Sequence, residues 1–259
     1  MNIFITGGTS GIGKELAKAY LKDGHQVGIC GGTENQFKSL WADIPENLFF
    51  FDLDVSNRSK SKEVIGSFQN GSIDLLIASA GINQKGDNGP IPDFSRAEKI
   101  IDINYKGTLN SIEAILPSML ERKKGHIVAI ASGSGFAGFP GAAAYSSSKA
   151  GVITFMESLT IDLKPLGISC TTICPGFVDT PLVENNGRKM PFIISPQLAA
   201  SKIKKAIENK RELYTFPLIV FFIMNLIRVM PRYIFRRLQK AAKLNKDINK
   251  LNEKDKGKL

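Results

Sequence analysis

The chain has 259 residues, 43% of them hydrophobic, and a mean hydropathy of −0.04. This length and composition are typical of a globular protein, built as one large α/β domain or two small ones. The net charge is +10, but residues 228–259 contain eleven Lys or Arg against three Asp or Glu, so the rest of the chain carries only +2. A nearly neutral body argues against binding of nucleic acid.

An apolar stretch begins directly after the first Met, because residues 2–6 (Asn-Ile-Phe-Ile-Thr) predict a strand. This leaves no room for a secretory signal peptide. The three cysteines all fall in expected strands, and an odd number of buried thiols suits a reducing compartment. No group of His, Cys and Asp residues has the spacing of metal ligands. We therefore expect a cytoplasmic protein that binds no metal.

A glycine-rich turn follows the first strand, and a helix is expected over residues 14–22. A strand, such a turn and a helix form the usual phosphate-binding unit. The glycines let the backbone approach a pyrophosphate, and the helix N-terminus offers free N–H groups. The alternative is a tight turn without a ligand. The candidate contacts are Gly7, Thr9, Ser10, Gly11, Ile12 and Gly13.

The second strand, expected over 27–30, ends in Gly31-Gly32-Thr33, at the position that normally selects the cofactor. An acid here would bind the ribose 2′-hydroxyl of NAD, and an Arg would accommodate the 2′-phosphate of NADP. Neither residue type is present. Thr33 can hydrogen-bond a phosphate, and a site without an acid repels a phosphate less. The residues therefore favour NADP(H) slightly over NAD(H).

Strands and helices alternate along the chain as far as residue 216. This alternation predicts an α/β fold, a doubly wound parallel sheet of six or seven strands in a Rossmann-type domain over 1–216. Ligands bind such sheets at the carboxyl ends of the strands. The later strands are expected at 48–53, 73–78, 126–131, 168–173 and 213–216, with helices ending near residues 68, 122, 164 and 210. Five polar or turn-forming residues follow strands: Gly7, Asp54, Gly81, Ser132 and Pro175.

Three connecting features carry their own expectations. Ser56 or Asn57 is the candidate N-cap of the helix that ends near residue 68. Pro175 and Gly176 are expected to end the sixth strand, and residues 177–195 to form a loop that is a candidate lid. The two histidines flank strands and are interpreted as structural.

Tyr145 and Lys149 are four residues apart in an expected helix, which puts both side chains on one face. An ammonium group close to a phenol favours the phenolate and lowers a pKa that is about 10 when unperturbed. Such a tyrosine can exchange a proton with an alcohol or a carbonyl near neutral pH. The spacing alone also fits an ordinary pair on a helix surface.

With these residues, the chain resembles the short-chain dehydrogenase/reductase family over residues 2–216. The family's Thr-Gly-x-x-x-Gly-x-Gly motif matches Thr6–Gly13, and its Tyr-x-x-x-Lys pair matches Tyr145 and Lys149. Two segments depart from the family pattern: Gly31-Gly32-Thr33, and Ala78-Ser79-Ala80-Gly81 in place of Asn-Asn-Ala-Gly. The catalytic Asn and Ser match Asn104 and Ser132. The remaining matches are cofactor contacts: Asp54, Val55, Ser79, Ala80, Gly81, Pro175, Gly176, Val178 and Thr180.

The resemblance implies an NAD(P)(H)-dependent oxidoreductase that interconverts a ketone and a secondary alcohol by hydride transfer. Tyr145 would act as the general acid in reduction or as the base in oxidation. Lys149 would lower the pKa of the tyrosine and bind the nicotinamide ribose. Ser132 would stabilise the substrate oxygen, and Asn104 would hold a relay water. The family also implies a homodimer or homotetramer.

Two other classes of protein use the same kind of sheet. A dinucleotide-binding sensor or scaffold without activity would be expected to lack the Tyr, Lys or Ser, and all three are present. A sugar epimerase or dehydratase usually has Gly-x-x-Gly-x-x-Gly and a larger C-terminal substrate domain. The substrate itself is not readable, although the apolar C-terminal segment favours a hydrophobic or lipid-like carbonyl compound.

Residues 217–244 form an extension that is apolar at first and basic afterwards. Its apolar run, 218–227, is about ten residues long and too short to span a bilayer. Pro231 should split the helix, and arginines recur every four residues from Arg228 to Arg236. The extension is either an amphipathic helix at the anionic inner face of a membrane, or a helix packed on the body or on another subunit. The predicted segments are thus 1–216, 217–244 and a disordered 245–259.

Overall fold

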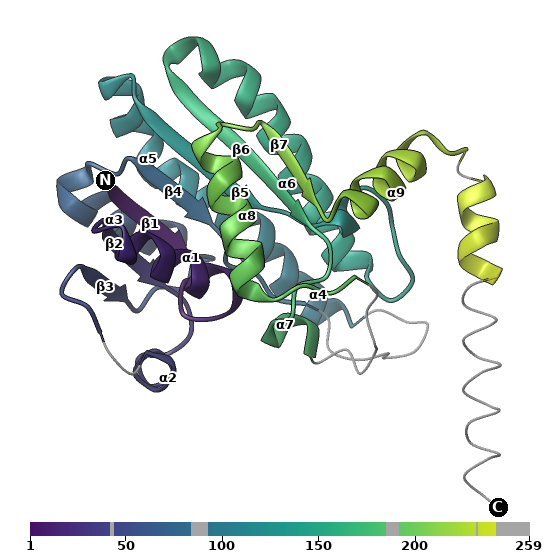
Figure 1. The fold of residues 1–259 in the computed structure, drawn as a ribbon, viewed down its shortest axis with the longest axis horizontal. Helices are drawn as coiled ribbons and strands as arrows, with labels where there is room; N and C mark the ends of the chain where they lie inside the picture. Colours follow the sequence, from purple (N-terminus) through teal and green to yellow (C-terminus); the bar gives the residue numbers. More distant parts are fainter. Residues whose placement is uncertain (42–43, 84–92, 185–191, 232, 242–259) are drawn as a thin grey trace, which may run out of the picture.

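The computed structural model describes residues 1–41, 44–83, 93–184, 192–231 and 233–241. Its strands are β1 (Asn2–Thr6), β2 (Gln26–Cys30), β3 (Leu48–Phe51), β4 (Leu75–Ala78), β5 (Gly125–Ile130), β6 (Ile168–Pro175) and β7 (Leu213–Phe216). They form one parallel sheet in the order β3-β2-β1-β4-β5-β6-β7 (Figure 1). The order reverses between β1 and β4, so the predicted doubly wound sheet is confirmed.

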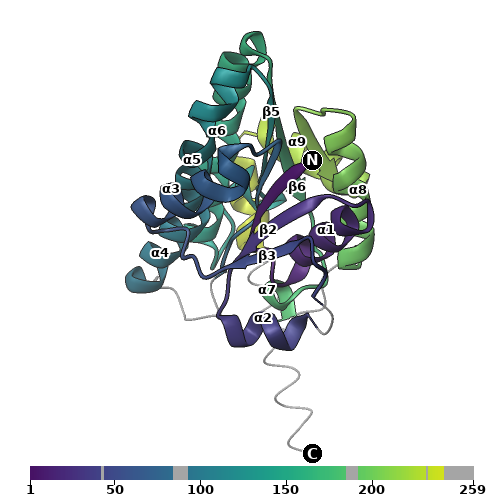
Figure 2. The ribbon, with the colours of Figure 1, turned by 90° about the vertical axis from the view of Figure 1, so that its left-hand side faces the viewer.

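Helices cover both faces of this sheet. They are α1 (Gly11–Lys22), α2 (Glu34–Leu40), α3 (Arg58–Ser67), α4 (Phe94–Ile101), α5 (Gly107–Arg122), α6 (Ala143–Leu163), α7 (Pro181–Glu184), α8 (Pro196–Glu208) and α9 (Leu218–Val229). Figure 2 shows α1 and α8 on one face and α3, α4, α5 and α6 on the other. α2 and α7 lie beyond the carboxyl ends of the strands. A further helical segment covers residues 233–241.

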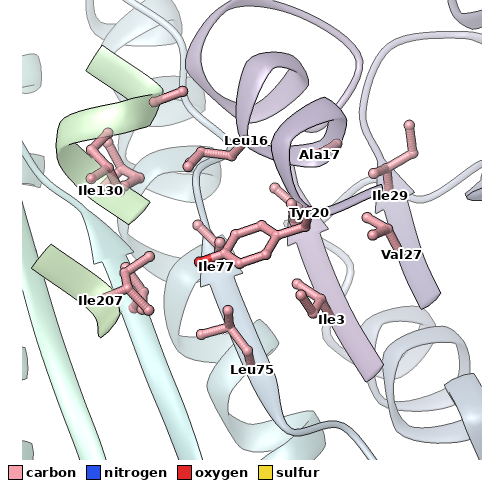
Figure 3. Close-up of a cluster of buried hydrophobic side chains, with 14 of the residues drawn as sticks. Ile3, Leu16, Ala17, Tyr20, Val27, Ile29, Leu75, Ile77, Ile130 and Ile207 are labelled. Atoms are coloured by element: carbon pink, nitrogen blue, oxygen red, sulfur yellow. The ribbon is translucent and has the colours of Figure 1, made fainter. Parts of the chain in front are cut away.

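Burial on both faces explains the apolar character of the central strands. Ile3, Phe4 and Ile5 of β1 are all 0% exposed, and their side chains alternate between the two helix layers. On one face, Leu16 and Tyr20 of α1 complete a core with β1, β2 and β4 (Figure 3). Each large apolar side chain buried in this way contributes about 1.5–3 kcal/mol. The core therefore holds the strand ends, and the loops that follow them, in a fixed arrangement.

α2 is a helix that the sequence pattern does not predict, and Thr33 is its N-cap. The Thr33 Oγ1 accepts a hydrogen bond from the Gln36 N–H at 3.3 Å, and the Gln36 Oε1 accepts one from the Thr33 N–H at 3.0 Å. This reciprocal arrangement is a capping box. The residue expected to contact a cofactor phosphate therefore also has a structural role.

Several strand boundaries differ from expectation by one or two residues, and one cap agrees with it. β6 continues to Pro175, which is paired with Phe216, instead of ending at Ile173. Proline is tolerated because it is the last residue of the strand, and the next N–H, from Gly176, donates to the Phe216 carbonyl at 2.8 Å. Asn57 caps α3 as expected, since its Oδ1 accepts the Lys60 N–H at 3.0 Å.

Parts of three predicted segments lie outside the described residues. These are 185–191 of the candidate lid, 232 and 242–244 of the C-terminal extension, and the whole of the tail predicted to be disordered, 245–259. In the described part of the lid, Val178 forms an isolated parallel bridge with Ile194. The three cysteines are free and buried.

Burial of His126 should make the fold less stable in acid. Its Nε2 lies 2.8 Å from the Thr171 Oγ1 between β5 and β6, and burial lowers its pKa to about 4. Between this value and the unfolded-state pKa of about 6.5, only the unfolded chain takes up the proton. Stability is therefore full above pH 6.5 and falls as the pH drops towards 4. We expect a loss of about 2–3 kcal/mol from this residue, discounted for its partial exposure.

Urea unfolding at several pH values measures this loss. His126→Gln should flatten most of the pH dependence between the two pKa values. His25→Gln is the matched change at the other histidine, which is less buried, and it should leave the dependence close to that of the wild type. Identical pH dependence for His126→Gln and the wild type would contradict the assignment.

Candidate active site

The side chains of Tyr145 and Lys149 lie together in the first turns of α6. Both residues are buried, with 9% and 4% of their surfaces exposed. The Lys149 Nζ lies 5.9 Å from the centre of the Tyr145 ring and donates a hydrogen bond to the carbonyl of Ile130, the last residue of β5, at 2.8 Å. The pair is therefore inside the protein, which excludes the alternative of an ordinary pair on a helix surface.

Ser132 follows β5, and its side chain lies within hydrogen-bonding reach of the Tyr145 hydroxyl. Its Oγ also accepts the Ser134 N–H at 3.1 Å, which fixes the position of the hydroxyl. Burial raises the pKa of Tyr145 above its usual value, and the hydrogen bond from Ser132 lowers it by less. The net pKa of this phenol is therefore above its usual value, in contrast to the acidic phenol predicted from the spacing, because desolvation of the phenolate outweighs the effect of Ser132.

Lys149 is perturbed by the same burial. Desolvation lowers its pKa to about 8, and the neighbouring Cys174 raises it by less. Cys174 lies at the end of β6, where burial raises the pKa of its thiol to about 12, so it stays protonated at neutral pH. Lys149 is therefore charged at pH 7 and loses its proton at slightly higher pH. Perturbed pKa values of this kind are concentrated at functional sites.

Asn104 lies in a π-helical turn, Asp102–Lys106, which interrupts the helix expected to end near residue 122. Its side chain is fully buried and binds the loop after β4. The Oδ1 accepts the Ile82 N–H at 2.8 Å, and the Nδ2 donates to the Ile82 carbonyl at 3.0 Å and to the Ser148 Oγ at 3.1 Å. π-helical turns occur often at functional sites, and this one joins α4 and α5 around a buried amide.

Gly81 shows how close these groups lie to one another. A Cβ on this residue would be 3.3 Å from the Asn104 Oδ1 and 3.5 Å from the Lys149 Nζ. The amide and the amine therefore face the same small volume at the end of β4. Together with the contact between Ser132 and Tyr145, this brings all four predicted catalytic residues to one end of the sheet.

The glycine-rich turn after β1 is packed too closely for larger residues. A Cβ on Gly13 would overlap the Gly7 carbonyl oxygen, and one on Gly7, whose φ is +68°, would lie 2.8 Å from the Ala80 Cα. Ser10 is the N-cap of α1, yet its side chain makes no capping hydrogen bond. The turn thus brings bare backbone, and the first N–H groups of α1, to the carboxyl ends of the strands.

The segments after β2 and β6 border this turn. A Cβ on Gly11 would lie 3.2 Å from the Thr180 Cγ2, and Val178 of the same segment is buried. On the other side, the Thr9 Oγ1 would lie 3.6 Å from a Cβ on Gly31. Ile12 packs its side chain on the core. The predicted cofactor contacts from β1, β2 and β6 therefore surround one turn.

Asp54 and Val55 lie in the turn after β3. The exposed Asp54 carboxylate accepts hydrogen bonds from the N–H of Ser56 at 2.9 Å and from its hydroxyl at 2.8 Å. Val55 is buried, and its carbonyl accepts a hydrogen bond from the Asn110 Nδ2 at 2.9 Å. Asp54 thus has local hydrogen bonds of its own at the carboxyl end of its strand.

Three residues order the site although the sequence analysis assigned them no role of their own. Asn110 fixes the turn after β3, as described. Thr6 fixes the turn after β4, because its Oγ1 accepts the N–H groups of Ser79 and Ala80 at 3.1 and 3.2 Å. Ser148 joins α6 to the buried amide of the π-helical turn. The sequence signal that could have identified these three residues is that they are polar at positions where helical or strand periodicity places the side chain on the buried face.

A parallel sheet that reverses its strand order at a bare glycine turn is the arrangement of dinucleotide-binding proteins. A buried tyrosine and lysine beside that turn are the groups expected of an oxidoreductase in this class. The protein-family model described as short chain dehydrogenase matches residues 1–191 of this chain. The chain belongs to this family, so the resemblance inferred from the motifs is confirmed.

Individual relatives agree with this assignment. An uncharacterized oxidoreductase of Myxococcus xanthus is 34% identical over 236 residues, which covers 89% of this chain and 93% of that protein. The NADP-dependent 3-hydroxy acid dehydrogenase YdfG of Escherichia coli is 32% identical over 180 residues, covering 69% and 73%. A short chain dehydrogenase from Burkholderia cenocepacia, solved in complex with NADP, has the same fold, with a TM-score of 0.79 at 23% identity over 92% of this chain and 96% of that one.

Proposed function

We propose that this oxidoreductase reduces a ketone, or oxidises the corresponding secondary alcohol, with NADP(H) as cofactor and Tyr145 as acid or base. The observation that carries the proposal is the closeness of the buried Tyr145 hydroxyl to Ser132, with Lys149 beside the phenol ring. A phenol and a hydroxyl that converge in a buried volume can hold a carbonyl oxygen and give it a proton.

The residues around the glycine-rich turn fit a dinucleotide. Backbone without side chains at Gly7 and Gly13 suits the close approach of a pyrophosphate, and the start of α1 favours its charge. The cofactor, when bound, supplies or accepts the hydride. Gly31 and Gly32 carry no carboxylate that would repel a 2′-phosphate, and the similar YdfG is named NADP-dependent. We therefore favour NADP(H) over NAD(H).

The proton steps follow from the chain's own groups. In reduction, the Tyr145 Oη gives its proton to the substrate oxygen, and the raised pKa keeps the phenol protonated at neutral pH. Ser132 donates a hydrogen bond to the same oxygen and stabilises the charge that develops there. Lys149, charged below about pH 8, stabilises the phenolate that remains and binds the cofactor ribose. Asn104, in the position of the family's proton relay, would hold a water near Lys149 that returns the proton to the Tyr145 Oη.

The substrate we favour is hydrophobic or lipid-like. Support comes from the rim of the site, where α9 and the segment after it pack on the loops that carry Gly176 and Phe139. A Cβ on Gly176 would lie 2.9 Å from the Val220 Cγ2, and the Phe139 and Phe235 rings lie 6.1 Å apart, edge to face. An apolar rim favours substrates with apolar surface to bury.

A panel of straight-chain ketones, assayed with NADPH and NADH in parallel, tests this function. We expect loss of the reduced-nicotinamide absorbance with NADPH, and a kcat/KM that rises roughly fourfold for each buried CH₂ of the substrate, since each contributes about 0.8 kcal/mol. A kcat/KM independent of chain length would contradict the hydrophobic substrate. Cofactor binding without turnover of any ketone or alcohol would favour the alternative of a dinucleotide-binding sensor. An isomerised product formed without net consumption of cofactor would favour the alternative of an epimerase.

A further inference from the structure

α9 presents an apolar stripe to solvent. Leu218, Phe222, Leu226 and Val229 are 72%, 66%, 59% and 78% exposed, and their spacing of four, four and three residues aligns them on one side of the helix. The opposite side attaches the helix to the body, because Ile227 is only 9% exposed. The outward side of a surface helix normally carries polar residues. This helix therefore has a second apolar side in addition to the one that holds it to the domain.

The helical segment at 233–241 continues this surface. Tyr233 and Leu238 are 66% and 55% exposed, whereas Phe235 is 8% exposed and packs with Ile227 and Ala137. As predicted, the chain is not helical at Pro231, so the surface consists of two short helices. Both helices extend beyond β7, on the right in Figure 1. We call the exposed side chains of the described residues in 218–231 and 233–240 the extension surface.

Basic residues accompany the apolar ones on the extension surface. Arg228, Arg236, Arg237 and Lys240 are all exposed. The sequence has no Asp or Glu between residues 213 and 246, so acidic side chains of this stretch cannot neutralise these charges. The extension surface is thus apolar and strongly positive at once.

The geometry points to an anionic lipid surface as the occupant, and we propose that residues 218–240 dock there. Exposed Leu, Phe and Tyr side chains flanked by Arg and Lys suit the boundary between acyl chains and negative headgroups. α9 has 12 residues and a length of about 18 Å, so it lies along the surface. None of the described helices is long and apolar enough to cross a membrane.

Charge decides between a lipid surface and a second copy of the chain. Two copies joined through the extension surface would bring like charges together, which is unfavourable. An anionic surface neutralises the same charges, each worth about fivefold in affinity near the membrane. The inference uses no residue of the catalytic site, so it does not depend on the proposed function.

Flotation of the full chain tests the proposal, with mixed vesicles of phosphatidylglycerol and phosphatidylcholine or vesicles of phosphatidylcholine alone. We expect the protein to float with the anionic vesicles and to stay in solution with the neutral ones. Sodium chloride at about 1 M should release most of it, because the Debye length falls to about 3 Å. Equal recovery in solution with both kinds of vesicle would overturn the proposal.

Two double variants separate the apolar and the basic contributions. Phe222→Ser with Leu226→Ser should weaken binding roughly tenfold or more, because both side chains would otherwise leave water. Arg236→Gln with Arg237→Gln should weaken it roughly fivefold for each charge removed. All four residues are exposed, so the variants should unfold at the same temperature as the wild type.

Matched changes elsewhere provide the controls. Ile161→Ser removes an apolar side chain that is 71% exposed on α6, and Lys22→Gln with Lys124→Gln removes two exposed charges. Both controls should bind anionic vesicles like the wild type. Equal losses in the controls and the extension variants would overturn the proposal. The proposal would also be overturned if the wild type bound neither kind of vesicle and light scattering showed that it is a dimer which the Phe222/Leu226 double variant converts to a monomer.

Discussion

Tyr145→Phe should bind NADP(H) about as tightly as the wild type and lose roughly 10²–10⁴-fold in kcat. The substitution keeps the ring, which is 9% exposed and packed in the site, and removes only the hydroxyl that contacts Ser132. Cofactor binding measured by fluorescence titration and turnover measured on the best ketone of the panel separate the two effects. Turnover equal to that of the wild type would remove Tyr145 from the mechanism.

Tyr20→Phe is the matched control for this change. Tyr20 is also a buried tyrosine, but it lies in the core between α1 and the sheet (Figure 3), and its hydroxyl has no hydrogen-bond partner among the described residues. Removing that hydroxyl should leave turnover unchanged and should not lower stability, because a buried polar group without a partner is unfavourable. A similar loss of turnover in both variants would mean that the effect at Tyr145 is not specific.

Lys149→Met should damage cofactor binding and turnover together. Methionine is unbranched and similar in length, so it fills the buried space without the ammonium group. Loss of the charged hydrogen bond that we propose between Lys149 and the ribose should weaken NADP(H) binding roughly tenfold to a hundredfold. Loss of the positive charge beside Tyr145 should lower kcat as well, because the phenolate formed in each turnover is no longer stabilised.

The unfolding temperature shows whether the losses in Lys149→Met come from the missing ammonium group or from unfolding of the variant. The ammonium of Lys149 is desolvated, as its lowered pKa indicates, and its removal relieves this cost but also removes the hydrogen bond to the Ile130 carbonyl, so the unfolding temperature should change little. Lys204→Met removes a lysine that pairs with Asp23, on the α1 and α8 side of the sheet, and should leave both activities intact. If Lys149→Met bound NADP(H) as tightly as the wild type, the role of the lysine at the ribose would be wrong.

The strands of this fold were predictable because their burial shows directly in the sequence. Apolar runs such as Leu75–Ala78 mark a sheet covered on both faces, and all four residues of this strand are buried. α2 was not predictable in the same way, because only Phe37 of its residues is buried and a short exposed helix has little periodicity. The π-helical turn was missed because Asp102–Lys106 lies between two α-helices, and its own five residues are too few to show a different periodicity.

The sequence could predict which residues lie together at the candidate site, but it could not predict the direction in which their pKa values shift. The spacing of Tyr145 and Lys149 correctly implies neighbouring side chains. Spacing carries no information about desolvation, however, which raises the pKa of the tyrosine and lowers that of the lysine. Supporting contacts such as that of Asn110 with Val55 span 55 positions in the sequence, so no local pattern indicates them.

The order of the strands also determines how far the chain can fold while it is being synthesised. β1 is central, yet its second neighbour is β4, so Ile3 cannot pair with Leu75 until that part of the chain has left the ribosome. Until then one edge of β1 lacks its partner, and the apolar side chains of the first strand remain open to other molecules. Parallel sheets with such distant pairings form slowly and are prone to aggregate while incomplete. Slower elongation before the fourth strand has emerged would therefore lengthen the period in which the nascent chain depends on chaperones.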